Sequence, residues 1–397
     1  MGAKTAKRVR GYGNGSVYFR ASDQRWVGKY KIGTKSNGKP AMKVVYGKTE
    51  AECHRKLKDV IDEAAKTEYI EVQNATVKDY MDEWLTSVKK NELKPKSFDR
   101  LEQTVNLYVN PAIGHIQLQA IKSKDVQTMI NNLRDSGKSH STIKKAYDAV
   151  NACFKLGVIQ KTVASNPAIG VTIPSKKVLP PKKIQFYTKD EATLLTKQAM
   201  SCWGNGKRRY PLGAFVHLLI NTGLRAGELL ALKWDQDVDI ENKVLTIHNN
   251  IVFVKDREKD KGYKLLEQDS VKTDAGQDRT IPLNDDAIAA LLDIRQVTGG
   301  YPYVMTTSEK NIVKPRQLDQ MFRRIATASG LPEEKIYGVH SLRHTFATLL
   351  LSNDVDIKTV SKLLGHSDVT ITYNTYIHVI KEQEAKALDA IPKLISK

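Results

Sequence analysis

The stretch that decides the fold is Thr222-Gly223-Leu224-Arg225-Ala226-Gly227-Glu228-Leu229. Gly223 predicts a break in a helix, and Arg225 would then stand at the start of a second helical run. Glu228 follows three residues later on the same helical face, where its carboxylate could orient the guanidinium. An arginine held in this way suits a phosphate, because its planar fork donates two hydrogen bonds and stays charged. Taken alone, the pair is still more typical of a surface ion pair.

Two candidate histidines, His340 and His366, follow with a second arginine and a tyrosine in three short segments. These are His340-Ser341-Leu342-Arg343-His344, then Leu364-Gly365-His366-Ser367, then Asn374-Thr375-Tyr376-Ile377-His378. His340 and Arg343 would share one face at the N-terminus of an apolar helix, where backbone dipoles favour an anion. Gly365 is typical of a helix C-cap, which places His366 just past a helix end. Tyr376 is the candidate nucleophile, although a phenol with a pKa of about 10 needs nearby cations or a base to attack efficiently.

In this order, and with Lys272 between the first two segments, the motifs resemble those of the tyrosine recombinases, the phage integrase family. The resemblance extends from about residue 74 to the end of the chain. It implies six catalytic residues with Glu228 in support: Arg225, Lys272, His340, Arg343, His366 and Tyr376. The two arginines would then clamp a DNA phosphate, His340 would transfer a proton or donate a hydrogen bond, and His366 would hydrogen-bond the phosphate.

The resemblance also implies that Lys272 protonates the leaving 5′ oxygen. Its segment, 270–276, is expected to form a β-hairpin turn before a strand at 279–283. The competing lysines lie in a charged run interpreted as a solvated loop insertion: Lys255, Lys259 and Lys261.

A second tyrosine, Tyr373, competes with Tyr376 for the role of nucleophile. In the family the nucleophile directly precedes a small residue and a histidine. Tyr376 fits this pattern better, although Ile377 replaces the usual threonine or serine.

The composition favours a polyanionic partner. The net charge is +19, and residues 1–48 hold twelve Lys/Arg against one acidic residue, so +11 of the total lies there. No apolar run is long enough to span a membrane, and no secretory pattern follows the basic N-terminus. We therefore expect a soluble DNA-binding protein of the bacterial cytoplasm, associated with the nucleoid. The three scattered cysteines are expected to be buried structural thiols: Cys53, Cys153 and Cys202.

Residues 1–66 are expected to form an arm-type DNA-binding domain, a three-stranded sheet backed by one helix. The β-like runs are 16–19, 26–32 and 42–46, and Thr49 would cap the helix. Basic residues would occupy the open face of the sheet, and the expected DNA contacts are Arg20, Lys29, Lys31 and Lys43. The order of elements resembles the arm-binding domain of mobile-element integrases.

Residues 74–170 predict an all-α domain that resembles the core-binding domain of integrases. Its helices would start at Thr76, Ser97, Ser123 and Ser139 or Ser141, and Asn110-Pro111 would end the second. Residues 171–184 follow as an extended basic linker, whose expected DNA contacts are Lys176 and Lys177. Residues 185–397 form the expected catalytic domain, mixed but mainly α, with a β-hairpin and a C-terminal tail helix.

The preferred interpretation is a site-specific recombinase of a phage or conjugative transposon that forms a covalent 3′-phosphotyrosine. The alternatives are a type IB topoisomerase and a non-catalytic architectural DNA-binding protein. Neither metal nor cofactor is expected, because the alternating carboxylates Asp235, Asp237 and Asp239 lie in an apparent helix-to-strand turn. The expected partners are arm and core attachment sites, further copies of the chain in a tetramer, an excisionase and DNA-bending factors. The tail helix would dock on a neighbouring subunit or cover its own core.

Overall fold

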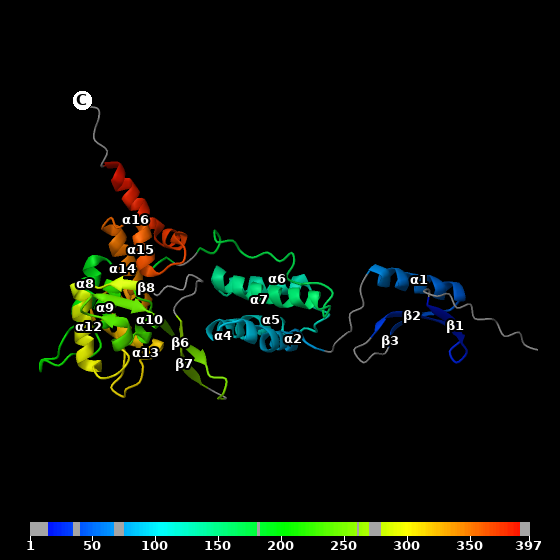
Figure 1. Ribbon diagram of the computed structural model, residues 1–397. Coiled ribbons are helices and arrows are strands. Elements are labelled where there is room, and N and C mark those ends of the chain that lie inside the picture. Colours follow the sequence, from blue (N-terminus) through cyan, green and yellow to red (C-terminus); the bar gives the residue numbers. More distant parts are fainter. Residues whose placement is uncertain are drawn as a thin grey trace, which may run out of the picture. The chain divides into compact units, whose positions relative to one another are not determined.

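The computed structural model describes residues 15–34, 40–66, 75–180, 183–259, 262–269 and 279–389. The chain divides into two compact units, Met1–Pro181 and Lys182–Lys397. Figure 1 shows a small sheet with one helix, a helical region, and a mixed α/β region in chain order. The mixed fold class predicted from the sequence is confirmed. Among the described residues, no helix is long and apolar enough to cross a membrane.

The first unit begins with an antiparallel sheet in the order β1-β2-β3, made of Ser16–Arg20, Arg25–Thr34 and Pro40–Gly47. Helix α1, Glu50–Lys66, packs against it. A Cβ atom on Gly28 would lie 3.2 Å from Cys53 Sγ of α1, so this face of β2 is the one that the helix covers. The three strands and the helix predicted from residues 12–66 are confirmed.

The open face of this sheet carries cations over aromatic rings. The Arg20 guanidinium lies 5.3 Å from the centre of the Tyr46 ring, and Lys29 Nζ lies 5.3 Å from that of Tyr18. Arg20 is also ion-paired with Asp23. Lys43 was expected on this face too, but it pairs with Tyr30 in the register and therefore belongs to the α1 side, where its side chain is exposed.

The helical region of the first unit contains helices that pack around one core. Its elements are α2 Val77–Glu83, η1 Trp84–Lys89, α3 Lys90–Glu92, α4 Pro95–Thr104, η2 Val105–Val109, α5 Asn110–Ile113, α6 Ser123–Asp135 and α7 His140–Ile159. The predicted caps Thr76 and Ser139 are confirmed, since each hydroxyl accepts a backbone N–H of the first turn. The break predicted at Asn110-Pro111 is wrong, because the chain stays helical to Ile113 after a π-helical stretch.

The linker prediction required an extended chain at the end of the first unit, but this segment is not wholly extended. Val178 and Leu179 both donate their backbone N–H to the carbonyl of Ser175, so a turn contains Lys176 and Lys177. Both lysines are exposed. Cys53 and Cys153 are buried, as predicted, whereas the prediction is wrong for Cys202, which is exposed in the loop after α8.

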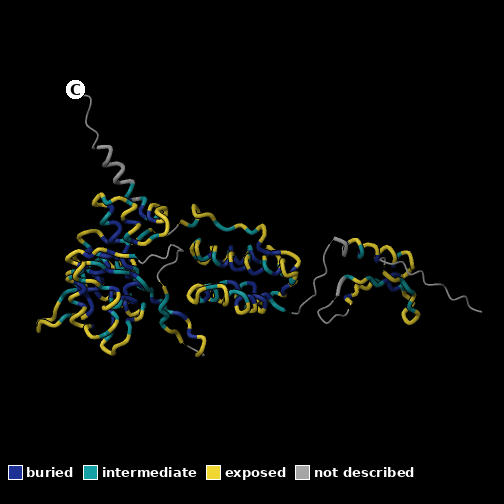
Figure 2. The backbone as a smooth tube through the Cα atoms, viewed as in Figure 1, coloured by how far each residue is buried: buried dark blue, intermediate teal, exposed yellow. Residues whose placement is uncertain are grey.

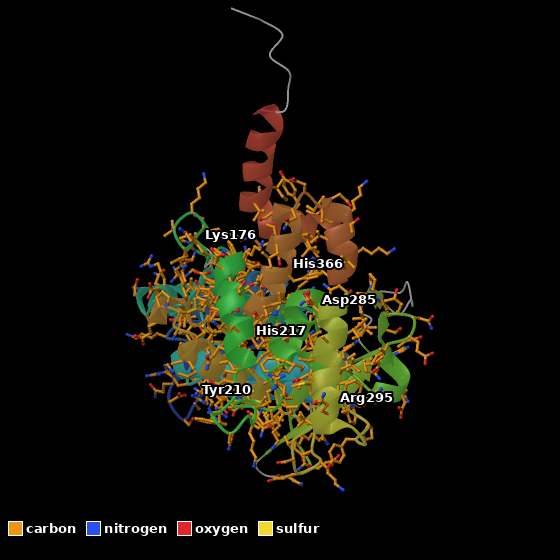
Figure 3. All side chains as sticks on the ribbon, turned by 90° about the vertical axis from the view of Figure 1, so that its left-hand side faces the viewer. Lys176, Tyr210, His217, Asp285, Arg295 and His366 are labelled. Atoms are coloured by element: carbon orange, nitrogen blue, oxygen red, sulfur yellow. The ribbon has the colours of Figure 1, made fainter. Side chains whose placement is uncertain are left out.

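The second unit is built on a helical core with a small amount of sheet, and its buried residues fill the interior (Figure 2). Its helices are α8 Lys189–Ala199, α9 Phe215–Thr222, α10 Ala226–Ala231, α11 Trp234–Asp237, α12 Asp285–Thr298, α13 Pro315–Ala328, η3 Glu333–Lys335, α14 His340–Ser352, α15 Ile357–Leu364 and α16 Val369–Asp389. Helices α9 and α12 pack together, with His217 on α9 and with Asp285 and Arg295 near opposite ends of α12 (Figure 3).

The strands of the second unit form two separate sheets. One has the order β4-β5-β8, made of Val238–Asp239, Val244–Ile247 and Arg279–Pro282, and the other pairs β6 Asn249–Lys255 with β7 Tyr263–Asp269. β6 and β7 form the β-hairpin of this unit. The hairpin expected around Lys272 is wrong in its topology, because β8 pairs with β5 and not with β7. Lys255 ends β6 and Tyr263 begins β7, so the described residues between them, 256–259 and 262, form a loop, in line with the interpretation of the charged run. Lys261 and Lys272 lie outside the described residues.

Candidate active site

Arg225 stands between two short helices because the chain turns sharply in front of it. Gly223 caps α9 with a left-handed φ of 62°, and a Cβ atom there would lie 2.3 Å from the Phe346 ring. Glycine meets both demands, since it has no Cβ. Arg225 is the N-cap of α10, and its backbone N–H donates to Glu228 Oε2 over 2.8 Å. The local prediction from residues 222–229 is confirmed.

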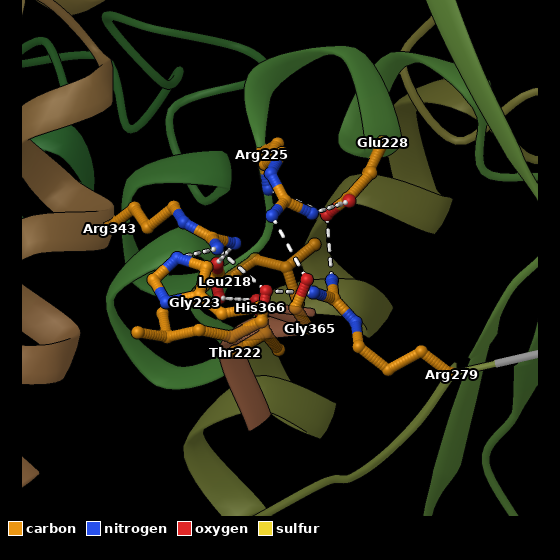
Figure 4. Close-up of polar contacts among 10 residues, drawn as sticks. Leu218, Thr222, Gly223, Arg225, Glu228, Arg279, Arg343, Gly365 and His366 are labelled. Atoms are coloured by element: carbon orange, nitrogen blue, oxygen red, sulfur yellow. Dashed lines mark hydrogen bonds and ion pairs between the residues drawn. The ribbon is translucent and has the colours of Figure 1, made fainter. Parts of the chain in front are cut away.

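The Arg225 side chain is held by two acceptors (Figure 4). One nitrogen, Nη1, lies 2.7 Å from Glu228 Oε1, and the other, Nη2, donates to the carbonyl of Gly365 over 3.1 Å. Its side chain is 41% exposed, whereas that of Glu228 is only 2% exposed. The pair is therefore not the surface ion pair that the sequence alone favoured, because the carboxylate is buried behind a guanidinium that reaches solvent.

Arg343 lies deeper, in the first turns of α14, and is almost fully buried. Its Nη1 donates to the carbonyl of Gly223 over 2.7 Å, and its Nη2 donates to that of Leu364 over 2.6 Å. Burial and the nearby Arg225 cation lower the pKa of Arg343 to about 9. The predicted phosphate-binding arginines therefore come together on residues 118 positions apart in sequence, beside the end of α15.

His366 has a tautomer fixed by its partners. Arg343 Nη2 lies 3.1 Å from His366 Nε2, and since a guanidinium only donates, Nε2 must accept. The proton is then on Nδ1, which donates to Thr372 Oγ1 over 2.8 Å. Burial, together with Arg343 and the other arginines, lowers the pKa of His366 to about 4. In this state the imidazole is neutral and orients Arg343. The predicted C-cap at Gly365 is confirmed by its left-handed φ of 63°.

A third arginine, Arg279 at the start of β8, completes the cluster. Its Nη2 lies 2.7 Å from Glu228 Oε2, and its Nη1 donates to the carbonyl of Leu364. Burial opposes the charge on Glu228, but Arg279 and Arg225 outweigh burial and hold the pKa of this carboxyl below its usual range. Two of the three guanidiniums are ion-paired with the single carboxylate, so the cluster keeps a net charge of about +2 for an anion.

Tyr376 is buried next to this cluster and forms a hydrogen bond with a histidine. Its hydroxyl lies 2.9 Å from Nδ1 of His344, and the residue is 1% exposed. Tyr376 interrupts α16 with φ −112° and ψ 21°. Burial raises the pKa of Tyr376 to about 12, although Arg343 partly opposes this. Tyr373, the rival nucleophile, is 40% exposed.

His340 opens α14 and stacks edge-on against His344, with ring centres 4.8 Å apart. Partial burial of the ring and the cations of Arg343 and Arg225 lower the pKa of His340, although the residue still reaches solvent. Burial and the neighbouring His340 and Arg343 lower the pKa of His344 to about 4. Both histidines at the start of α14 are therefore neutral at pH 7.

The structure thus brings together Arg225, Glu228, His340, Arg343, His366 and Tyr376. Sequence reasoning missed two neighbours, Arg279 and His344. For His344 the signal was its place in the motif after Arg343, whereas nothing in the sequence around Arg279 indicated a pairing with Glu228.

Two of the three carboxylates considered as a metal site accept hydrogen bonds within the fold. Asp237 lies 2.6 Å from Nδ1 of His248 and accepts the backbone N–H of Lys233, and Asp239 accepts from Asn242. Within the described ranges, no group of three or more His, Cys, Asp or Glu side chains is placed to hold a metal ion.

Comparison with known proteins agrees with the motifs. Residues 185–383 match the phage integrase family, and residues 76–134 match its N-terminal SAM-like domain. A tyrosine recombinase XerC-like protein of Caldanaerobacter subterraneus subsp. tengcongensis is 30% identical, over 98% of this chain and 99% of its own. The chain belongs to the phage integrase family. It is a tyrosine recombinase, an enzyme that breaks and rejoins DNA at specific sites, and the topoisomerase and architectural alternatives are not favoured.

Other relatives agree with this assignment. The integrase of Staphylococcus phage L54a is 26% identical, over 86% of this chain and 98% of its own. Among solved structures, the Tn1549 transposon integrase in complex with a circular intermediate DNA matches with a TM-score of 0.61 and 20% identity, over 79% of this chain and 99% of that one. A lambda integrase tetramer bound to a Holliday junction matches with a TM-score of 0.56 and 17% identity, over 92% and 96%. At this identity, the two structures support the fold alone.

Proposed function

We propose that this recombinase integrates and excises a mobile element, and that Tyr376 is its nucleophile. The carrying observation is the cluster of Arg225, Arg343 and His366 beside a buried tyrosine. In the proposed step the Tyr376 oxygen forms a bond to phosphorus, and the bond from phosphorus to the 5′ oxygen breaks. The tyrosine loses its proton, the leaving oxygen gains one, and the product is a 3′-phosphotyrosine with a free 5′-hydroxyl. Because the ester keeps the bond energy, the reverse attack can rejoin the strand.

The arginines would act on the charge that develops at the non-bridging oxygens. A preorganised donor of this kind is worth a factor on the order of 10²–10³ in rate. Lys272, outside the described residues, is proposed as the acid for the leaving oxygen. His340 is proposed to pass protons at the solvent-exposed edge of the site.

The buried tyrosine is proposed to be a resting state. With a pKa of about 12, ionising Tyr376 at pH 7 costs about 7 kcal/mol, since each pKa unit is worth about 1.4 kcal/mol. A bond to neutral His344 holds the hydroxyl in the apolar cluster of α14, α15 and α16. We infer that binding of DNA moves Tyr376 toward the arginines, because the attack needs the oxygen close to the phosphorus.

The remaining parts of the proposal concern DNA and assembly. We propose that residues 1–66 bind arm DNA through the open face of β1-β2-β3, residues 74–170 and 185–397 bind core DNA, and residues 171–184 link them. Exposed Tyr46 beside Arg20, and Lys29 over Tyr18, support a DNA-contacting role for this face, because phosphates favour cations and bases favour aromatic rings. A tetramer is proposed by analogy with lambda integrase. An excisionase, DNA-bending factors and action at the bacterial nucleoid complete the proposal.

A nicked suicide substrate tests the chemistry. Wild type should become covalently attached to DNA, whereas Tyr376→Phe should form no adduct while its DNA affinity stays within a few-fold. Tyr373→Phe is the matched control, because it removes a neighbouring hydroxyl from the same helix, and it should form the adduct normally. The assignment of Tyr376 is wrong if Tyr376→Phe still forms an adduct and Tyr373→Phe does not.

A further inference from the structure

Arg279 shares one acceptor with Arg225 and another with Arg343, although the sequence motifs do not include it. It lies on β8, at 51 positions from Glu228 in sequence, and its side chain is 14% exposed. One guanidinium nitrogen is ion-paired with Glu228 Oε2, and another donates to the carbonyl of Leu364 (Figure 4). Both acceptors are shared: Glu228 with Arg225, and the Leu364 carbonyl with Arg343.

The first shared acceptor concerns charge. Glu228 is 1% exposed, and a buried carboxylate with a single partner is costly. If Arg225 were that partner, the carboxylate would cancel the charge that the phosphate needs. Arg279 supplies a second cation on the opposite oxygen, so Glu228 can orient Arg225 while the cluster stays positive.

The second shared acceptor concerns position. A Cβ atom at Gly365 would lie 2.5 Å from Arg279 Nη1, so the glycine leaves room for this guanidinium against the chain that leads to His366. Arg279 thereby holds the end of α15, whose carbonyls at Leu364 and Gly365 accept from Arg343 and Arg225. Arg279 is also much less exposed than Arg225, whose side chain is 41% exposed.

We propose that Arg279 is a positioning residue for the recombination reaction: it sets Arg225 through Glu228, and Arg343 through the Leu364 carbonyl. This rests on the proposed phosphate-binding role of those two arginines. Arg279 itself does not touch DNA. Its loss therefore weakens charge stabilisation at the phosphate and leaves the binding of the duplex intact.

The test uses the full-length chain with Arg279→Gln. Single-turnover cleavage of the suicide substrate should fall by on the order of 10²-fold, the loss expected when a donor is misplaced by about 1 Å. Affinity for the same duplex should stay within a few-fold. Arg295→Gln is the matched control, because Arg295 is an exposed arginine of the same unit that lies over Trp234, away from the cluster, and its cleavage rate should match wild type.

A methylphosphonate at the scissile position separates positioning from structural damage. This group carries no charge, so an enzyme with weakened arginines should lose much less rate on it than on phosphate. Arg279→Gln should show this partial rescue, as Arg225→Lys should. Lys272→Ala should show none, because its proposed role is on the leaving oxygen.

A second variant keeps the test valid if Arg279→Gln folds poorly. Arg279→Gln combined with Glu228→Gln removes the buried carboxylate that has lost one of its two cationic partners, so its thermal unfolding should return toward wild type while its cleavage of phosphate stays slow. The proposal is overturned if the well-folded double variant cleaves phosphate at the wild-type rate, or loses equal rate on phosphate and methylphosphonate. Absence of any adduct with wild type would instead refute the proposed function.

Discussion

Two of the neutral histidines of the site should make the catalytic unit sensitive to acid. His344 and His366 each have a pKa of about 4 in the folded chain, against about 6.5 when unfolded. Because the folded pKa is depressed, the contribution to stability is complete above pH 6.5 and is lost as the pH falls through 4. At pH 4.5 this shift would lower the free energy of unfolding by about 2.5 kcal/mol for each histidine, and partial exposure of the rings reduces this to about 2 kcal/mol.

The physical reason is that each proton would enter a crowded cationic site. Arg343, Arg225 and Arg279 surround His366, and Glu228 opposes them only in part. Protonated His366 would also lose its ability to accept from Arg343. Acid should therefore open the packing of α14 against α15 before it unfolds regions without such histidines.

Hydrogen exchange of α14 amides in the full-length chain measures this opening at each pH, after correction for the intrinsic pH dependence of exchange. Between pH 7 and 4.5, the free energy of opening should fall by about 4 kcal/mol in wild type. His366→Asn should show about half of that fall, since asparagine does not titrate. If the two proteins show parallel curves over this range, the histidines are not held neutral by the cluster, and the reasoning is refuted.

Two further predictions follow from the cap of α9 and from the N-terminal sheet. Gly223→Ala should destabilise the catalytic unit by about 2–4 kcal/mol in thermal or urea unfolding, because of its left-handed φ and the clash of the added Cβ with Phe346. Gly330 is the control, since it has a φ of 84° and no atom within 4 Å of an added Cβ, so Gly330→Ala should show only the smaller backbone cost. Equal losses of stability in the two variants would contradict the clash. Deletion of residues 1–66 should leave cleavage of a short core-site duplex intact, remove protection of arm DNA and make the salt dependence of DNA binding shallower. Footprinting would contradict this if the full-length and truncated proteins protect the same bases.

Local signals in the sequence predicted much of this fold. The caps at Thr76, Ser139 and Gly365 depend on hydrogen bonds within a few residues, so their residue types indicate them directly. The family motifs likewise predicted which residues gather in the site, although Arg225 and Arg343 lie 118 positions apart. The pairing of Arg279 with Glu228 has no local signal, because it forms only after β8 has joined β5.

Strand pairing and strand faces were the weaker predictions. The turn-rich residues before β8 indicated a hairpin, but β8 found its partner in β5, and such non-local pairing depends on the whole core. Lys43 was placed on the wrong face because the sequence of β3 does not alternate clearly between apolar and polar residues. Met42, Val44 and Tyr46, on the face opposite to Lys43, are all exposed although they are apolar.

The capped ends of α9 and α15 hold Arg343 through backbone atoms, in addition to its contact with the His366 ring. Its two guanidinium nitrogens rest on the carbonyls of Gly223 and Leu364, where the two helices finish. The last carbonyls of a helix carry the negative end of its dipole, so they attract a guanidinium without an ionised acid that would cancel its charge. Point substitution cannot delete a carbonyl. The two carbonyl contacts of this arginine should therefore survive sequence drift at position 364 and be lost when the path of the backbone changes, so substitution of either glycine cap should disturb them.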